Sequence, residues 1–286
     1  MFERLTRSWQ LVKASAAVLK QDRKLLLFPL ISSMAMLAVL ASFAIPVMGW
    51  VVFSDRSGQG SAVAGSTFYI IAFLFYLTQY FVIFFFNAAL VGAAMIRLDG
   101  GTPSLADGLR LAASKWTSIL GYAAIAATVG MVLRAIAERV GFLGRIITAL
   151  LGAGWTVATY LVVPVLVARD VGPIEAVKES AQILKCTWGE NLVGQAGLGV
   201  AFALIQFFVV ALGVALVIGA VPSTFLVMLG LAFTMGAVLL SFLVQGALSG
   251  IYAAALYRYA TQNGNSQGFD TDALRSAFVA GSVKAA

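Results

Sequence analysis

The sequence predicts an all-α integral membrane protein with six transmembrane helices, arranged as three repeats of one amphipathic interfacial helix plus two spans. Two observations predict this fold. The 286-residue chain is 61% hydrophobic and only 11% charged, whereas soluble domains carry about 25% charged residues, so its polar groups cannot cover a water-exposed surface. Six apolar segments, each at least as long as the ~20 residues that cross a bilayer, follow three amphipathic stretches in pairs.

Each repeat opens with a stretch in which apolar residues recur at helical spacing and the other face carries charged side chains. The stretches are residues 2–24, 103–116 and 173–188, and they contain Trp9, Trp116 and Trp188. Helices of this kind lie flat at the membrane surface with their apolar face in the acyl boundary. We expect all three on the same side of the membrane. Packing as soluble-style caps on the helical bundle is the alternative.

The apolar segments define the six spans. They cover residues 25–53, 68–96, 117–139, 142–168, 192–220 and 224–257. Pro29 falls near the start of the first span, where proline costs little, whereas Pro46 predicts a kink in its outer third. The first apolar run is too long for the core of a signal peptide and follows a patterned helix, so we interpret it as a retained span.

Two connections, at residues 97–103 and 169–173, stop one helix and start the next. Thr102 is expected to cap the second amphipathic helix. Asp99 and Asp170 occupy equivalent places in these connections. We expect each to pair with the arginine that ends the preceding span or to cap the next helix.

The repeats also divide the chain into domains. These are residues 1–24 (an amphipathic helix), 25–97, 98–169 and 170–260 (the three membrane repeats), and 261–286 (a polar tail). The second, fourth and sixth spans are followed by Arg97, Arg169 and Arg258, as copies of one ancestral unit would be. With the three tryptophans, these arginines are the residues that we expect at the membrane interface.

The distribution of basic residues predicts the topology. Most of the 19 lysines and arginines lie on the N-terminal side of the predicted spans, and only Arg56, Arg134, Arg139 and Arg145 lie on the other side. The positive-inside rule then places both termini in the cytoplasm of a cell membrane. Cytoplasmic basic loops also account for the net charge of +7, with anionic membrane lipids rather than nucleic acid as the partner.

Residue types that carry catalysis or bind metals are scarce. The chain has no histidine, and its single cysteine, Cys186, cannot form an internal disulfide or a zinc cluster. It also contains no phosphate-binding Gly-Lys-Ser/Thr loop, no metalloprotease motif and no nucleophile elbow. We therefore expect no enzymatic activity, no cofactor and no metal.

Polar residues inside spans are costly in lipid and usually face the bundle interior. They are Gln79 and Asn87 in the second span, Gln195 and Gln206 in the fifth, and Gln245 in the sixth. Such amides form interhelical hydrogen bonds, or they line a polar cavity between spans two, five and six.

The outer end of the third and fourth spans carries a charged group, consisting of Arg134, Glu138 and Arg145. Offsets of 4 and 11 residues return to nearly the same helical angle, and Arg134 and Glu138 are spaced to form an ion pair. The group is either a collar that extends its charges toward water or a basic vestibule for an anionic headgroup or solute.

Two segments resemble known families. Residues 8–13 (SWQLVK) and 19–29 (LKQDRKLLLFP) resemble the start of an uncharacterised family of bacterial and archaeal multi-pass membrane proteins. Residues 173–188 (PIEAVKESAQILKCTW) are similar to a segment of a wider group that includes the membrane domain of glycerophosphodiester phosphodiesterases. The resemblance covers most of the chain and implies the fold. It implies no activity, because phosphodiester cleavage in that group belongs to a separate soluble domain.

Three functions are compatible with these patterns. The amphipathic helices and the missing catalytic groups favour a non-enzymatic envelope protein that organises lipid or a partner complex. The intramembrane amides favour a transporter or permease for a small or amphiphilic solute. A membrane-embedded enzyme would depend on Asp99 or Asp170. Glycine-rich spans also make a homo-oligomer or a complex with another membrane protein plausible.

Overall fold

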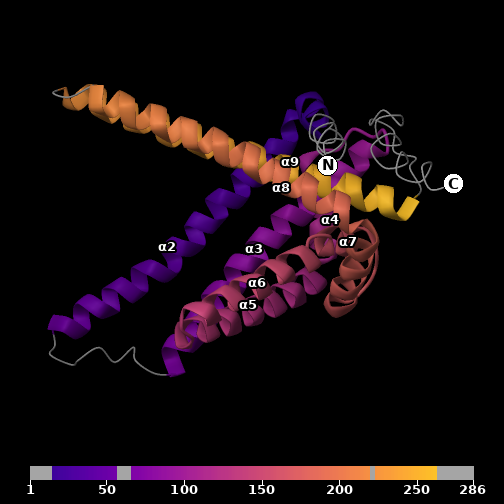
Figure 1. Cartoon of the computed structure of the whole chain (residues 1–286), viewed down its shortest axis with the longest axis horizontal. Helices are drawn as coiled ribbons and strands as arrows, with labels where there is room; N and C mark the ends of the chain where they lie inside the picture. Colours follow the sequence, from indigo (N-terminus) through magenta and orange to yellow (C-terminus); the bar gives the residue numbers. More distant parts are fainter. Residues whose placement is uncertain (1–14, 57–65, 220–222, 263–286) are drawn as a thin grey trace. The chain divides into compact units, whose positions relative to one another are not determined.

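In the computed structural model, which describes residues 15–56, 66–219 and 223–262, the regular elements are helices (Figure 1). Residues 15–21 are helical. The labelled elements follow in the order η1 (Arg23–Leu26), α2 (Leu27–Arg56), α3 (Ser66–Leu98), α4 (Leu105–Ser114), α5 (Trp116–Arg139), α6 (Phe142–Ala158), α7 (Val162–Ala168), α8 (Pro173–Gly219) and α9 (Thr224–Gln262).

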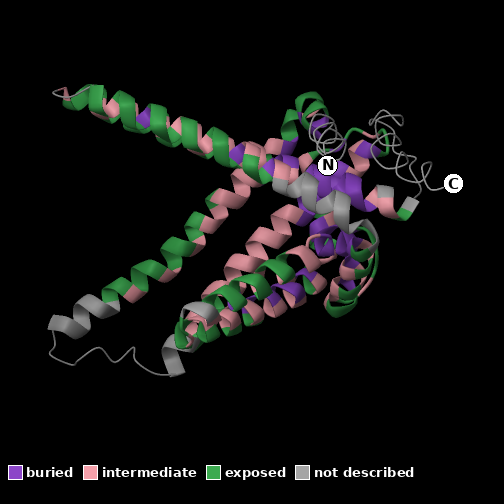
Figure 2. Cartoon of the chain, in the orientation of Figure 1, coloured by how far each residue is buried: buried purple, intermediate pink, exposed green. Residues whose placement is uncertain are grey.

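Six helical stretches in the described residues are long and apolar enough to cross a membrane. They are Arg23–Gly49, Ile70–Leu98, Trp116–Arg139, Gly144–Ala168, Gly197–Gly219 and Thr224–Arg258. Each overlaps one predicted span, so the all-helical, multi-pass membrane architecture is confirmed. Large apolar side chains are exposed along much of α8 and α9, as Phe207 and Phe225 are, and acyl chains are the natural cover for such a surface (Figure 2).

The helices group into two compact units. Unit 1 contains the described parts of Met1–Pro29, Ala94–Pro103 and Cys186–Ala286, and unit 2 contains Leu30–Ala93 and Ser104–Lys185. Because the boundaries fall inside α2, α3 and α8, the chain passes from one unit to the other within continuous helices.

The core of unit 1 includes the packing of η1 against α9. Pro29 lies 3.8 Å from the position of a Cβ on Gly246, and Ile251 and Tyr252 are buried nearby on the same helix. The end of α9 is fixed by Arg258, which forms an ion pair with Asp99 and donates a hydrogen bond to a backbone carbonyl of α3.

Asp99 therefore pairs with Arg258. The sequence predicted instead that it would pair with Arg97 or cap the next helix. Arg97 donates instead to the Gln21 side chain at 3.1 Å and to the Gly101 carbonyl at 3.2 Å. The partner predicted from sequence was the nearest arginine along the chain. The end of α9 brings Arg258 closer to Asp99, and the Arg258 side chain is only 11% exposed.

Unit 2 is built on close helix contacts at small residues. A Cβ on Gly92 would lie 2.8 Å from Leu111, and a Cβ on Gly121 would lie 2.8 Å from Pro173. Glycine at these positions lets α3 approach α4 and lets α5 approach the start of α8. Helix α5 also contacts α6 and α7, and α7 is buried from Val162 to Val167.

The structure corrects the predicted start of the second amphipathic helix. Helix α4 is capped by Ser104, whose hydroxyl accepts from the Asp107 N–H at 3.2 Å while the Asp107 carboxylate accepts from the Ser104 N–H at 3.0 Å. This reciprocal arrangement satisfies two free N–H groups at once. Thr102 was the predicted cap, but Leu105 stands three residues after it and offers no such acceptor.

The third predicted repeat contains one long helix. Helix α8 runs without interruption over 47 residues, from the predicted interfacial stretch at 173–188 into the fifth candidate span, which begins at Gly197. No proline interrupts this stretch, and the helix continues. Its buried positions before residue 186 are Ala176, Ser180 and Leu184, whereas Ile174 from the predicted apolar stripe is 62% exposed.

The connection between α7 and α8 is held by ion pairs at the unit 2 surface. Lys115 donates to the Asp170 carboxylate at 2.9 Å, and Arg169 donates to Glu179 at 2.6 Å. Asp170 therefore pairs with Lys115 rather than with the predicted Arg169. The hydrogen bond and the charge of Lys115 lower the pKa of the Asp170 carboxyl below its usual value of 3.8.

The fourth span is broken into α6 and α7 at residues 159–161. Pro164 has no N–H to give to the carbonyl four residues earlier, and its ring crowds that carbonyl, which accounts for the break. Ser180 of α8 repairs it. Its hydroxyl donates to the Ala158 carbonyl at 2.8 Å and accepts from the Leu161 N–H at 3.1 Å. Ser180 is fully buried, so this one side chain pairs a buried N–H and a half-buried carbonyl that the break leaves free.

Replacing Ser180 by alanine should destabilise the protein by about 1–3 kcal/mol, because a buried N–H and a half-buried C=O lose their partner together. The measurement is the thermal unfolding midpoint in nanodiscs. Ser42→Ala is the matched control, since Ser42 is an exposed helical serine that bonds only within its own helix. An equal midpoint for both variants would contradict the bridging role.

The Lys115–Asp170 pair should make stability depend on pH in the acid range. The folded-state pKa of Asp170 is lowered, so its contribution is complete above about pH 4 and is lost as the pH falls through the lowered pKa. We expect a small coupling in the double-mutant cycle of Lys115→Met and Asp170→Asn at pH 6, decreasing toward pH 3. A coupling that is unchanged at pH 3 would be inconsistent with this pair.

Candidate functional site

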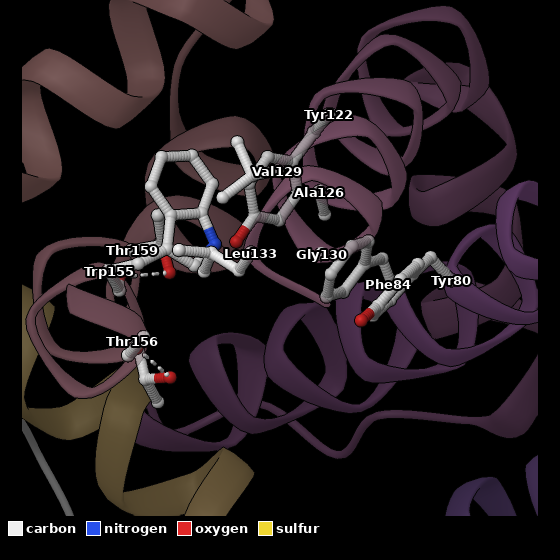
Figure 3. A pocket seen from close by; sticks show the side chains of 11 residues that line it. Tyr80, Phe84, Tyr122, Ala126, Val129, Gly130, Leu133, Trp155, Thr156 and Thr159 are labelled. Atoms are coloured by element: carbon white, nitrogen blue, oxygen red, sulfur yellow. Dashed lines mark hydrogen bonds between the residues drawn. The ribbon is translucent and has the colours of Figure 1, made fainter. Parts of the chain in front are cut away.

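Unit 2 contains a cavity of about 420 Å³ between α3, α5 and α6 (Figure 3). Its lining residues are Tyr80, Phe84, Tyr122, Ala126, Val129, Gly130, Leu133, Gly152, Trp155, Thr156 and Thr159. Tyr80 and Phe84 lie near the middle of the span Ile70–Leu98, so the cavity lies within the depth of the spans. A volume of this size is in the range of small-molecule sites.

The walls of the cavity are aromatic. Phe84 stacks on Tyr80 with ring centroids 5.7 Å apart and packs on Tyr122 of α5 at 4.4 Å. The indole of Trp155 closes the α6 side (Figure 3). These rings present a continuous apolar wall with hydroxyl and indole N–H groups at its edges.

Small residues opposite the rings create the hollow. Gly130 lies against Tyr80, because a Cβ there would be 3.3 Å from the tyrosine hydroxyl. Gly152 leaves room on α6, where a Cβ would have only ordinary contact, at 3.8 Å, with Leu133. Together with Ala126, these positions leave a space that larger side chains would fill.

The polar groups of the cavity come from the end of α6, beside the break in the fourth span. The hydroxyls of Thr156 and Thr159 donate within their own helix, to the carbonyls of Gly152 at 2.9 Å and Trp155 at 2.8 Å. The Thr159 side chain also forms a hydrogen bond with Tyr122, whereas the Thr156 oxygen remains able to accept a hydrogen bond. No lining residue carries a formal charge at neutral pH. The cavity suits a molecule with an apolar body and few polar groups.

Of the charged group predicted at the outer end, Arg134 lies next to this cavity, directly after the lining residue Leu133. Arg134 donates to Glu138 at 3.0 Å, as its spacing predicts, and also to the Tyr76 hydroxyl at 2.7 Å. Arg145 lies on α6, beyond the break at Val140 and Gly141. The helical-angle argument holds only within one helix, so it does not place Arg145 with the other two.

The predicted intramembrane amides whose side chains the structure describes do not line this cavity. Gln79 donates to the Met36 carbonyl at 3.4 Å, and Gln206 donates to the Val238 carbonyl at 3.5 Å. Both bonds join neighbouring helices, which was the alternative to a cavity role. Asn87 and Gln245 are half-buried, and the side chain of Gln195 lies outside the described part of the chain. A cavity between spans two, five and six stays a prediction.

The predicted interface residues have mixed placements. Trp116 is 53% exposed at the start of α5. Trp9 and the side chain of Trp188 lie outside the described residues. Arg97, Arg169 and Arg258 all form hydrogen bonds or ion pairs with protein groups. Among the described residues, no three histidine, cysteine, aspartate or glutamate side chains are grouped as metal ligands.

Sequence reasoning missed the cavity, although signals for it were present. Pro164 inside the fourth span indicates a break in the helix, and Gly130 and Gly152 indicate positions without side-chain volume. The second span is rich in aromatic residues, which by themselves indicate only an apolar helix. Pairing Tyr80 and Phe84 with glycines on other spans requires the helix neighbours, which the sequence does not provide.

Comparison with known proteins identifies a family but no activity. Residues 66–269 match a family of unknown function (DUF6159), which covers most of the chain. No curated protein matches the sequence.

Proposed function

We propose a function from the geometry, because the chain belongs to a family, DUF6159, whose function is unknown. The protein is a non-enzymatic membrane protein that holds a small amphiphilic molecule between α3, α5 and α6, as a permease or a lipid-organising protein would. The observation that carries this proposal is the aromatic cavity of about 420 Å³ beside the broken fourth span.

Two physical features support binding within the membrane. Non-helical backbone at this depth persists where protein or a cavity surrounds it, and membrane transporters often build their sites at broken helices. The aromatic wall and the few hydroxyl acceptors fit a largely apolar ligand with one or two polar atoms. Such a ligand reaches the site from the lipid phase, and no charged residue of the lining opposes its entry.

The finer features of the architecture belong to the same proposal. They are the three repeats, the interfacial placement of the amphipathic helices, both termini in the cytoplasm, contact with anionic lipids, and self-association. A distant relationship to the membrane domain of glycerophosphodiester phosphodiesterases is also part of the proposal, on the resemblance of residues 173–188.

A second candidate function is the organisation of lipid or a partner complex at the cytoplasmic face. It is favoured by the exposure of Trp116 directly after α4, because a tryptophan at this place suits the membrane–water interface. Helix α4 supports it further, since Gly108 and Ala112 are buried while Arg110 on another face is exposed.

Filling the cavity should abolish ligand retention. Gly152→Leu places a branched side chain in the hollow, whereas Gly154→Leu is the matched control because Gly154 is exposed with nothing within 4 Å of a Cβ. We would purify both variants in native-lipid nanodiscs and identify retained molecules by native mass spectrometry. We expect a molecule that is retained by wild type and Gly154→Leu and lost from Gly152→Leu. Equal retention in all three would refute the cavity as the site.

The second candidate predicts a different dependence. Replacing Trp9, Trp116 and Trp188 by glutamate should remove any lipid or protein subunit held at the cytoplasmic face while all six spans still insert, because a charge cannot stay in the acyl boundary. The same mass measurement, combined with protease protection of the loops, checks this. Unchanged retention in the triple variant would dismiss the interfacial function and leave the cavity function standing.

A further inference from the structure

We propose that the occupant of the cavity is an anionic lipid, whose headgroup binds Arg134 and Tyr76 and whose apolar part lies along the aromatic wall. This inference rests on the proposed function and adds the charge of the ligand and the position of its headgroup. It starts from three residues that the cavity itself does not include: Tyr76, Arg134 and Glu138, here called the outer cluster.

The outer cluster adjoins the cavity on two helices at once, and on α5 Arg134 directly follows the lining residue Leu133. Tyr76 precedes the lining residue Tyr80 by four residues on α3, and Arg134 follows the lining residue Gly130 by four residues on α5. Residues four apart lie on the same helix face, one above the other. The hydrogen bond between Arg134 and Tyr76, at 2.7 Å, joins these two helices directly outside the cavity.

A row of rings connects the outer cluster with the cavity. Tyr76 stacks on Tyr80 with centroids 6.5 Å apart, Tyr80 stacks on Phe84 at 5.7 Å, and Phe84 packs on Tyr122 at 4.4 Å. The row begins at the arginine and ends in the hollow. A molecule that lies along this row would meet the Arg134 cation at one end and an apolar surface over the rest of its length. An anionic lipid, with a charged headgroup and apolar chains, matches this arrangement.

Arg134 has the depth and the free donors for a headgroup. It lies five residues before the end of α5, which is about 7.5 Å along the helix axis. From there its long side chain reaches the headgroup level. The guanidinium has five N–H donors. Nε serves Glu138 and one Nη1 donor serves Tyr76, while the side chain is 65% exposed, so donors remain for an incoming phosphate.

Glu138 gives the outer cluster its resting partner. Without a ligand, its carboxylate neutralises Arg134, which lowers the cost of a charge at this depth. An anionic headgroup must compete with this carboxylate. Affinity for an anionic lipid should therefore rise when the carboxylate is removed and fall when the arginine is removed. Both changes should have a smaller effect on a zwitterionic lipid of the same chains, because its choline offsets the charge of its phosphate.

The test titrates the detergent-solubilised full chain with phosphatidylglycerol, or with phosphatidylcholine of identical acyl chains, and measures bound lipid by native mass spectrometry. We expect wild type to prefer phosphatidylglycerol. Arg134→Gln should weaken that binding about tenfold, the scale of a charge-assisted hydrogen bond, and Glu138→Gln should strengthen it. Tyr76→Phe, which keeps the ring, should cause a smaller loss.

Three controls separate the possible failures. Arg145→Gln removes an exposed arginine of α6 and should have little effect; a loss equal to that of Arg134→Gln would mean general surface electrostatics and overturn the inference. Inorganic phosphate that binds as tightly as the lipid would also overturn it. If Gly152→Leu abolishes lipid binding while Arg134→Gln does not alter it, the headgroup assignment fails and the cavity function stands. If neither variant alters binding, both proposals fail.

Discussion

The constraint on which this structure depends is that backbone polar groups at membrane depth need partners within the protein. Unbroken helices meet it along most of the chain. The fourth span does not, because Pro164 interrupts it, and the groups left at Ala158 and Leu161 are paired by the hydroxyl of Ser180. One buried serine on α8 thus allows irregular backbone beside the cavity. Thr159, which lines the cavity, stands at the same break.

Composition and periodicity were sufficient for the architecture and insufficient for the contacts. Six spans follow from apolar length alone, and the structure has them. The Arg134–Glu138 pair follows from spacing within one helix. Asp99 and Asp170 were assigned partners along the chain, but their partners are Arg258 and Lys115, which only the folded arrangement brings near. Spacing predicts neighbours within an element, and the packing of helices decides the rest.

The polar amides show why residue type alone is a weak indicator of a membrane site. Because amides are costly in lipid, Gln79 and Gln206 were expected either to bond between helices or to line a cavity, and both donate to backbone carbonyls of adjacent helices. The cavity is instead lined by tyrosine, tryptophan and threonine, and these residue types in an apolar span do not by themselves indicate a binding site. What makes the hollow is the absence of side-chain volume at Gly130 and Gly152, and glycine is common enough in membrane helices that it does not by itself indicate a cavity.

The two glycines have a consequence for how such a protein diversifies. Because the hollow depends on missing side-chain volume at these two positions and on no dedicated ligand-binding motif, one nucleotide change can convert glycine to alanine or valine and alter which molecules fit. Under the proposed binding function, members of one family could then differ in ligand while sharing every span and every ion pair. Specificity would follow the size of two side chains, and the rest of the sequence would not reveal it.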